Sequence, residues 1–119
     1  IFSVTVPRIR FLHNDADGLI TAANLKEIGV NMFNFSFNHS MGEIRALAGP
    51  DVILVGNIPA RDILASGTPA QVEDAVKKAF GEISPCERII WSAGGGMPPG
   101  VGNENINAFI RAVKNCSVL

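Results

Sequence analysis

Residues 52–80 read VILVGNIPARDILASGTPAQVEDAVKKAF and contain the pattern of one complete strand-to-helix unit. The run VILV at its start is apolar, rich in β-branched residues and without polar alternation, as expected for a strand buried on both faces of a parallel sheet. Thr68, Pro69 and Gln71 have the spacing of an N-cap, a first-turn proline and a capping-box partner. Apolar residues then recur at helical spacing, so the stretch predicts a buried strand followed by an amphipathic helix.

The same alternation of strand and helix patterns runs through the rest of the chain. Short connections between such elements predict parallel strands joined by right-handed crossovers. Two α/β architectures fit, half of a (β/α)8 barrel and a small open doubly wound sheet, and the pattern alone does not separate them. The predicted strands are 8–13, 30–37, 52–55 and 88–93, and the predicted helices are 14–29, 39–50, 60–67, 68–80 and 103–115.

Local signals also predict where the other helices begin and which faces they bury. Ser40 and Glu43 have the spacing of a second capping box. Asp15 or Asp17 is expected to cap the helix over 14–29. The predicted buried stripe of the last helix consists of Ile106, Phe109, Ile110 and Val113.

Composition limits the class of protein. The 119 residues predict a single domain over 1–119, and its start in mid-pattern at Ile1 suggests a fragment of a longer protein. The formal net charge of −1 argues against nucleic-acid binding, which needs a basic surface. No apolar run approaches the roughly 18 residues of a membrane span, so no membrane contact is expected. Cys86 and Cys116 form no disulfide framework or CxxC motif, which predicts free thiols and a reducing cytoplasm.

Polar side chains gather where the predicted strands end, which is where parallel α/β folds carry their chemistry. The densest group is His13, Asp15 and Asp17. His13 and Asp15 stand two residues apart on an extended chain, so they point the same way and could share one metal ion. His13 is alternatively a general acid or base oriented by a carboxylate, with Asp17 facing a substrate. In the third interpretation both aspartates are only helix caps.

Further polar residues follow the other strands. Asn57 comes directly after VILVG, and its amide is expected to bind either a substrate carboxylate or a helix end. The run Gly94–Gly96 lets backbone approach a ligand, and its N–H groups could cradle an anion; the alternative is a plain loop. Asn38 and His39 either reach the same pocket or only lead into the helix that starts at Ser40.

Three segments together resemble the C-terminal half of the uroporphyrinogen decarboxylase superfamily. They are RIRFLHND, the stretch 52–80 and RIIWSAGGGMPPGVGNENINAFIRAVK, which cover most of the chain. The most specific parts are Gly56-Asn57 followed by Gly67-Thr68-Pro69, and the closing Gly-Gly-Met-Pro-Pro and Glu-Asn-Ile. The resemblance implies that the four units are the last four of a (β/α)8 TIM barrel, with the other half upstream.

The superfamily contains uroporphyrinogen decarboxylases of porphyrin biosynthesis and zinc-dependent methyltransferases that move a methyl group from a corrinoid protein to a thiol or folate. The methyltransferases resembled here carry His-x-Cys after the first of these strands and another cysteine in the final loop. His13 matches this pattern, Asp15 replaces the first cysteine, and Gly95 stands in the place of the second. The resemblance therefore implies an oxygen-ligand variant of the zinc site at His13 and Asp15, with Asp17 as the alternative carboxylate, or no cofactor for a decarboxylase.

Three functions follow as expectations. The first is part of a methyltransferase relative, with a methyl acceptor as substrate and a corrinoid protein as partner, because His-x-Asp is closest to His-x-Cys. The second is uroporphyrinogen decarboxylase, a lyase acting on a porphyrinogen. The third is a non-catalytic binding or assembly module. The isolated fragment is expected to be inactive and to self-associate, because a barrel site draws on several strands and a half-barrel leaves open sheet edges.

Overall fold

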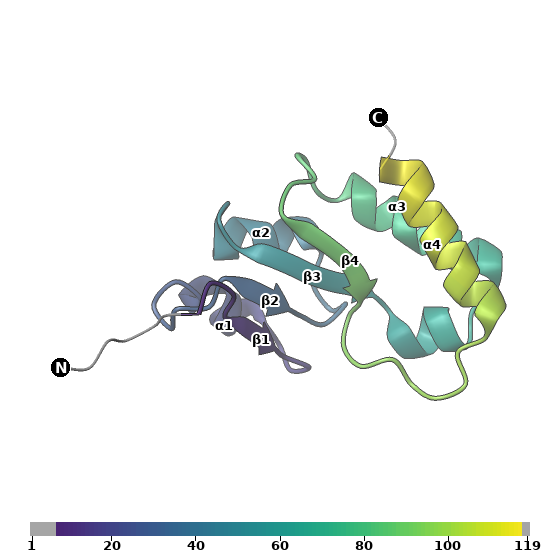
Figure 1. The fold of residues 1–119 in the computed structure, drawn as a ribbon, viewed down its shortest axis with the longest axis horizontal. Helices are drawn as coiled ribbons and strands as arrows, with labels where there is room; N and C mark the ends of the chain where they lie inside the picture. The colour runs from purple at the N-terminus through teal and green to yellow at the C-terminus, as the bar shows by residue number, and fades with distance from the viewer. Residues whose placement is uncertain (1–6, 118–119) are drawn as a thin grey trace.

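The computed structural model describes residues 7–117 of the chain, in which four strands alternate with helices (Figure 1). The predicted alternation is therefore confirmed, with a π-helical turn, η1, between the third strand and its helix. The strands are β1 (Phe11–His13), β2 (Met32–Asn34), β3 (Ile53–Ile58) and β4 (Ile89–Ala93), and the helices are α1 (Leu19–Asn24), α2 (Met41–Ala48), η1 (Ala60–Ala65), α3 (Pro69–Gly81) and α4 (Asn103–Ser117).

All neighbouring strands pair in parallel, and their spatial order β1-β2-β3-β4 is also their order along the chain. Right-handed crossovers in an unreversed order place every helix on the same face of the sheet. A doubly wound sheet would need a reversal of strand order that sends helices to both faces. The chain is therefore half of a (β/α)8 barrel, and the alternative of an open doubly wound sheet is wrong.

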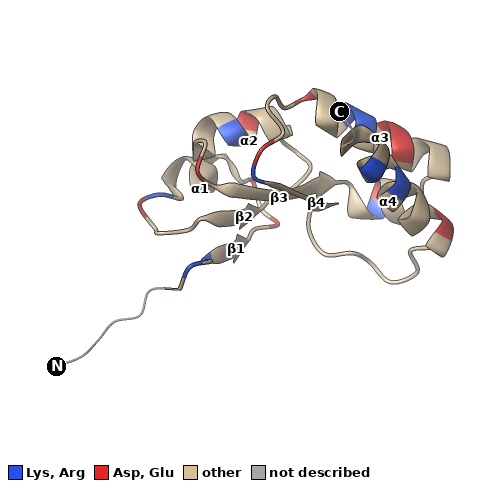
Figure 2. Cartoon of the chain, turned by 45° about the horizontal axis from the view of Figure 1, so that its top comes forward, with Lys and Arg blue, Asp and Glu red and all other residues tan. Residues whose placement is uncertain are grey.

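Two apolar cores lie between the sheet and its helices. In the first, α1 and α2 pack against side chains that include Phe33 and Leu54, and in the second, η1, α3 and α4 pack against Ile58. Trp91 packs against both cores and stacks on Phe80, with the ring centroids 4.0 Å apart. None of the four strands in residues 7–117 contains Lys, Arg, Asp or Glu, so the charged residues lie on the helices and loops (Figure 2). In the described part of the chain, no helix has the length and apolar character needed to cross a membrane.

Two helices begin where the capping boxes predict. The Ser40 hydroxyl accepts a hydrogen bond from the backbone N–H of Glu43, whose carboxylate accepts one from the Ser40 backbone. Thr68 and Gln71 make the same reciprocal pair, and Pro69 occupies the first turn of α3. Each pair satisfies N–H groups that a helix start leaves without a partner, which explains why these two boundaries are predictable.

The first helix is shorter than the predicted helix over 14–29. Its N-cap position is Gly18, which has no side chain to form a cap. Asp17 accepts a hydrogen bond of 3.3 Å from the backbone N–H of Leu19, so it supplies part of the expected capping. Asp15 accepts no backbone N–H within the described residues, so of the two predicted alternatives Asp17 is the one that contributes to the cap.

The buried face of α4 also differs from the predicted one. Asn105, Ala108 and Ala112 are buried, whereas Ile110 of the predicted stripe is 44% exposed. The small side chains of Ala108 and Ala112 let α4 lie close against α3. The helix therefore buries the face that carries these alanines rather than the face centred on its larger apolar residues. The predicted buried stripe is therefore wrong at Ile110.

Asn105 joins the two most specific motifs of the sequence. Its side-chain N–H group donates to the backbone carbonyl of Gly67 at 2.7 Å and to that of Leu64 at 3.0 Å. Asn105 is itself buried, and the two carbonyls belong to the turn that leads into α3. One side-chain amide therefore holds α4 against the turn that leads into α3.

The sheet face opposite the helices carries exposed apolar side chains. Phe11 is 53% exposed and Ile90 is 46% exposed, and both alternate along their strands with residues that enter the cores. On α1, Ile20 is 81% exposed. In a closed barrel such positions are covered by further strands and helices, so this half of a barrel presents uncovered apolar surface.

Replacing Asn105 with Ala is expected to lower the free energy of unfolding by about 2 kcal/mol, because one buried and one half-buried carbonyl lose their donor. Asn107→Ala is the matched control, since Asn107 is an exposed asparagine on the same helix. Urea denaturation of the protein that contains this chain measures both. Equal effects of the two substitutions would show that the Asn105 bonds contribute nothing.

The 119-residue chain by itself is expected to self-associate at micromolar concentration, because its edge strands and exposed apolar side chains lack cover. Sedimentation velocity measures this directly. Ile20→Lys should reduce the association without affecting either core. A monomer with cooperative unfolding would contradict the expectation.

Candidate functional site

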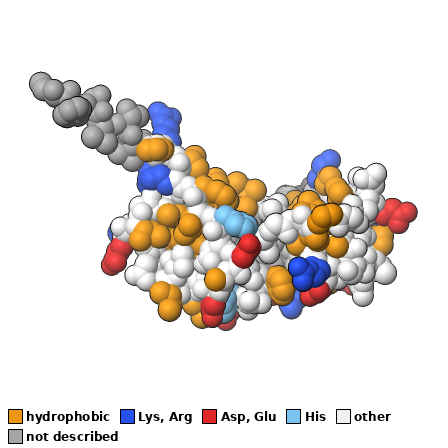
Figure 3. Space-filling model, turned by 90° about the horizontal axis from the view of Figure 1, so that it is seen from below, with side chains coloured by type: hydrophobic (Ala, Val, Ile, Leu, Met, Phe, Trp, Pro, Cys, Tyr) orange, Lys and Arg blue, Asp and Glu red, His pale blue; other side chains and the backbone are white. Residues whose placement is uncertain are grey.

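The polar residues singled out by the sequence meet at the carboxyl-end edge of the sheet. His13 ends β1, Asn57 lies near the end of β3, and Gly94 directly follows β4. A surface view shows histidine side chains next to acidic ones on one face of the molecule (Figure 3). The parallel order of the strands explains this gathering, because it sends all four carboxyl ends to one edge.

His13, Asp15 and Gly95 lie side by side. The Nε2 atom of His13 is 3.2 Å from Oδ2 of Asp15. The other carboxylate oxygen of Asp15 lies against Gly95, so closely that a Cβ atom at this glycine would be only 2.7 Å from it. Gly95 also has a φ of +111°, which favours glycine. The loop after β4 thus leaves room for the Asp15 carboxylate only because residue 95 has no side chain.

The residues present do not fit a zinc site. A catalytic zinc ion takes three protein ligands, and His13 and Asp15 supply two. Nowhere in residues 7–117 do three His, Cys, Asp or Glu side chains gather in a position to hold a metal ion. The centre is therefore a histidine–carboxylate pair beside a glycine loop.

A cavity of about 400 Å³ opens beside this pair. Its lining includes Asp15, the exposed Arg61 and Asp62 of η1, and the run Gly94–Gly96. The Arg61 guanidinium and glycine N–H groups are donors suited to an anionic group. Asp15 and Asp62 are acceptors on the same cavity. The lining is therefore able to bind a ligand that carries both a carboxylate and a hydrogen-bond donor.

Asp17, His39 and Asn57 tie two loops and the strand β3 together. The Nε2 atom of His39 is 2.8 Å from Oδ1 of Asp17, which links the loop after β1 to the loop after β2. The Asn57 amide donates to the backbone carbonyl of His39 at 2.6 Å, which extends the link to β3. The side-chain N–H of Asn57 is therefore used within the protein, and Asp17 is engaged by His39.

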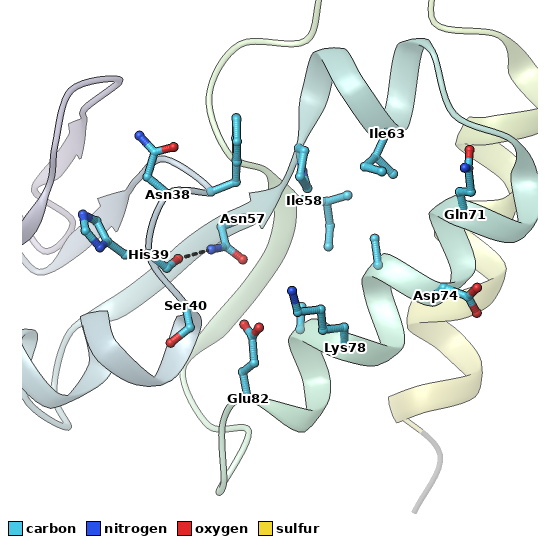
Figure 4. Close-up of a pocket in the computed structure, with 14 residues that line it drawn as sticks. Asn38, His39, Ser40, Asn57, Ile58, Ile63, Gln71, Asp74, Lys78 and Glu82 are labelled. Atoms are coloured by element: carbon cyan, nitrogen blue, oxygen red, sulfur yellow. Dashed lines mark hydrogen bonds between the residues drawn. The ribbon is translucent and has the colours of Figure 1, made fainter.

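A larger cavity of about 570 Å³ lies between the segment that leads into α2 and the helix α3 (Figure 4). Asn57 and the His39 segment line one side, and Lys78 and Glu82 reach in from α3. Helical periodicity places Lys78 and Glu82 on a solvent face, so the sequence analysis does not single them out. Their spacing of four residues is the signal that they share one side of the helix.

Asn34 is a further residue that the sequence analysis misses. It is buried in β2, and its side-chain N–H group donates to the carbonyls of Val55 at 2.7 Å and Ala93 at 3.2 Å. These two carbonyls lie on β3 and β4, so one amide joins three strands close to the site. A polar residue between Phe33 and Phe35 in an apolar run is the signal that could have revealed it.

The pKa of Asp17 lies below its ordinary value of 3.8, because His39 hydrogen-bonds its carboxylate and the backbone N–H of Leu19 adds a second bond. His39→Ala should therefore raise the pKa of Asp17 toward 3.8, as measured by carboxyl NMR titration. A depressed folded pKa contributes stability above the unfolded value, and that stability disappears as the pH falls through the folded value. His13→Ala is the control, because His13 contacts Asp15 instead. An unchanged Asp17 titration in His39→Ala would contradict the assignment.

Comparison with known proteins identifies relatives of this chain. Three curated uroporphyrinogen decarboxylases are similar to it. Those of Dichelobacter nodosus, Saccharophagus degradans and Gloeobacter violaceus are 28%, 29% and 28% identical over 100, 112 and 109 residues. The matches cover 84%, 94% and 92% of this chain but only 28%, 30% and 30% of the relatives. The chain thus spans about three-tenths of the length of the curated relatives it matches.

A methyltransferase from Methanosarcina mazei has a similar structure, with a TM-score of 0.74 at 18% sequence identity. The likeness covers 90% of this chain and 31% of the methyltransferase, and it supports the partial-barrel fold. The model of the uroporphyrinogen decarboxylase (URO-D) family matches residues 3–116. Because that match covers nearly all of the sequence, the chain belongs to the uroporphyrinogen decarboxylase family.

Proposed function

We propose that the protein containing this chain is a barrel enzyme that moves a methyl group from a corrinoid protein to a thiol or folate acceptor. The observation that carries the proposal is the His13–Asp15 pair, 3.2 Å apart and seated against Gly95. These positions correspond to the metal-ligand positions of the methyltransferases that the sequence resembles. Asp15 also lines a cavity with room for a small molecule.

The residues of this chain would act by positioning the acceptor and taking its proton. A methyl acceptor that carries a proton loses it as its lone pair forms the new bond to carbon, while the electron pair of the broken carbon–cobalt bond stays with the corrinoid. The imidazole of His13 is suited to receive that proton near neutral pH. Asp15, whose carboxylate lies 3.2 Å from the Nε2 atom of His13, would orient the ring. Arg61 and the glycine loop would hold an anionic part of the acceptor.

His13→Ala is expected to lower methyl transfer by about 100-fold, the lower range for loss of a general base. The assay follows the absorbance change of a methylcorrinoid protein mixed with the full-length enzyme and acceptor. Asp51→Asn is the control, because Asp51 is an exposed carboxylate that does not line the cavity beside His13. Unchanged turnover in His13→Ala, or no transfer from any methylcorrinoid, would contradict the proposal.

Porphyrinogen decarboxylation is the second candidate, and Arg61 is the observation that favours it. Its guanidinium lies on the same cavity as Gly94–Gly96, so this cavity could grip the carboxylates of a porphyrinogen. Turnover of uroporphyrinogen by the full-length protein under anaerobic, reducing conditions would establish this activity. Failure of both assays would leave a binding or assembly module. We propose the reducing cytoplasm as the compartment, because Cys86 and Cys116 are free thiols.

A further inference from the structure

The centre formed by His13, Asp15 and Gly95 disagrees with the zinc site that the family resemblance implies. It supplies one imidazole and one carboxylate, and no third metal-binding side chain joins them in the described part of the chain. We infer that this centre works without a metal ion, and that Asp15 and Gly95 together exclude one. The inference takes the role of this centre from the proposed function, but the experiment that tests it measures metal content.

Asp15 occupies the space that a ligand at residue 95 would need. A Cβ atom at Gly95 would lie 2.7 Å from Oδ1 of Asp15, closer than real Cβ contacts come. The φ of +111° at Gly95 adds strain for any residue with a side chain. The Asp15 carboxylate therefore fills the space beside Gly95, and a cysteine at 95 would require the Asp15 side chain to turn away.

The second obstacle is the state of His13. Its Nε2 atom, one of the two ring nitrogens able to bind a metal, already faces Oδ2 of Asp15 at 3.2 Å. A metal bound at this nitrogen would have to separate the pair, and residues 7–117 would supply it with only two ligands. The imidazole and the carboxylate are instead in contact with each other, an arrangement that needs no metal ion between them.

A centre without a metal ion favours one class of methyl acceptor over the other. A thiol is a poor nucleophile until it is deprotonated, and a metal ion is one means of stabilising its thiolate. A nitrogen acceptor carries a lone pair near neutral pH and loses its proton only as the new bond forms. That proton would pass to His13. Of the acceptor classes proposed above, the centre therefore suits one that attacks through nitrogen.

Zinc content of the full-length protein tests the inference directly. Protein purified without chelators from zinc-supplemented cells should carry less than about a tenth of an equivalent of zinc, and chelator should leave any methyl transfer unchanged. Stoichiometric zinc that is lost in His13→Ala would overturn the inference. Absence of zinc together with absence of methyl transfer would overturn the proposed function alone.

The double variant Asp15→Cys with Gly95→Cys tests whether these two residues exclude the metal. Removing the Asp15 carboxylate relieves the close contact at residue 95. The two new cysteines and His13 then provide three metal-binding side chains. This variant should take up one equivalent of zinc and, with cobalt(II), show a thiolate charge-transfer band. Asp15→Cys with Gly96→Cys is the matched control and should take up none, because residue 96 lies outside the contact with Asp15. A folded double variant without zinc would contradict the assignment, and the wild-type zinc content decides the metal-free claim if that variant does not fold.

Discussion

β3 pairs in parallel with β2 on one side and with β4 on the other, and both the fold and the site depend on this double pairing. Its apolar side chains enter both cores, with Leu54 in the first and Ile58 in the second. Asn57 lies near the carboxyl end of β3, where its side-chain amide donates a hydrogen bond to the backbone carbonyl of His39. Because it pairs in parallel with both neighbours, β3 also aligns their carboxyl ends at one edge of the sheet.

The parts of the fold that could be predicted depend on residues close together in the sequence. Thr68 and Ser40 start their helices through bonds to residues three positions away, so spacing alone reveals them. The choice between a half-barrel and a doubly wound sheet depends on strand order, which periodicity does not contain. The buried face of α4 depends on how closely another helix approaches, and there Ala108 is buried while Ile110 is exposed.

The candidate site also has a part that local sequence spacing predicts and a part that it does not. The spacing of two residues in a strand-like segment predicts that His13 and Asp15 face one another, and they do. The partner of Asp17 is His39, 22 positions away, and no local pattern indicates that pairing. Asn34 is missed for the same reason, because its acceptors lie on two other strands. Sequence pattern thus finds groups within one loop, and the sheet determines which loops meet.

The contact between Asp15 and Gly95 shows why the barrel geometry matters for the chemistry. These residues follow β1 and β4, the first and last strands of the sheet, which would stand about 14 Å apart in a flat sheet with ordinary strand spacing. Yet a Cβ atom at Gly95 would be 2.7 Å from the Asp15 carboxylate. Such proximity requires the loops to lean inward over the carboxyl ends, as they do around the mouth of a curving sheet. The shape of the partial barrel therefore brings the pair from one edge strand to the glycine loop of the other.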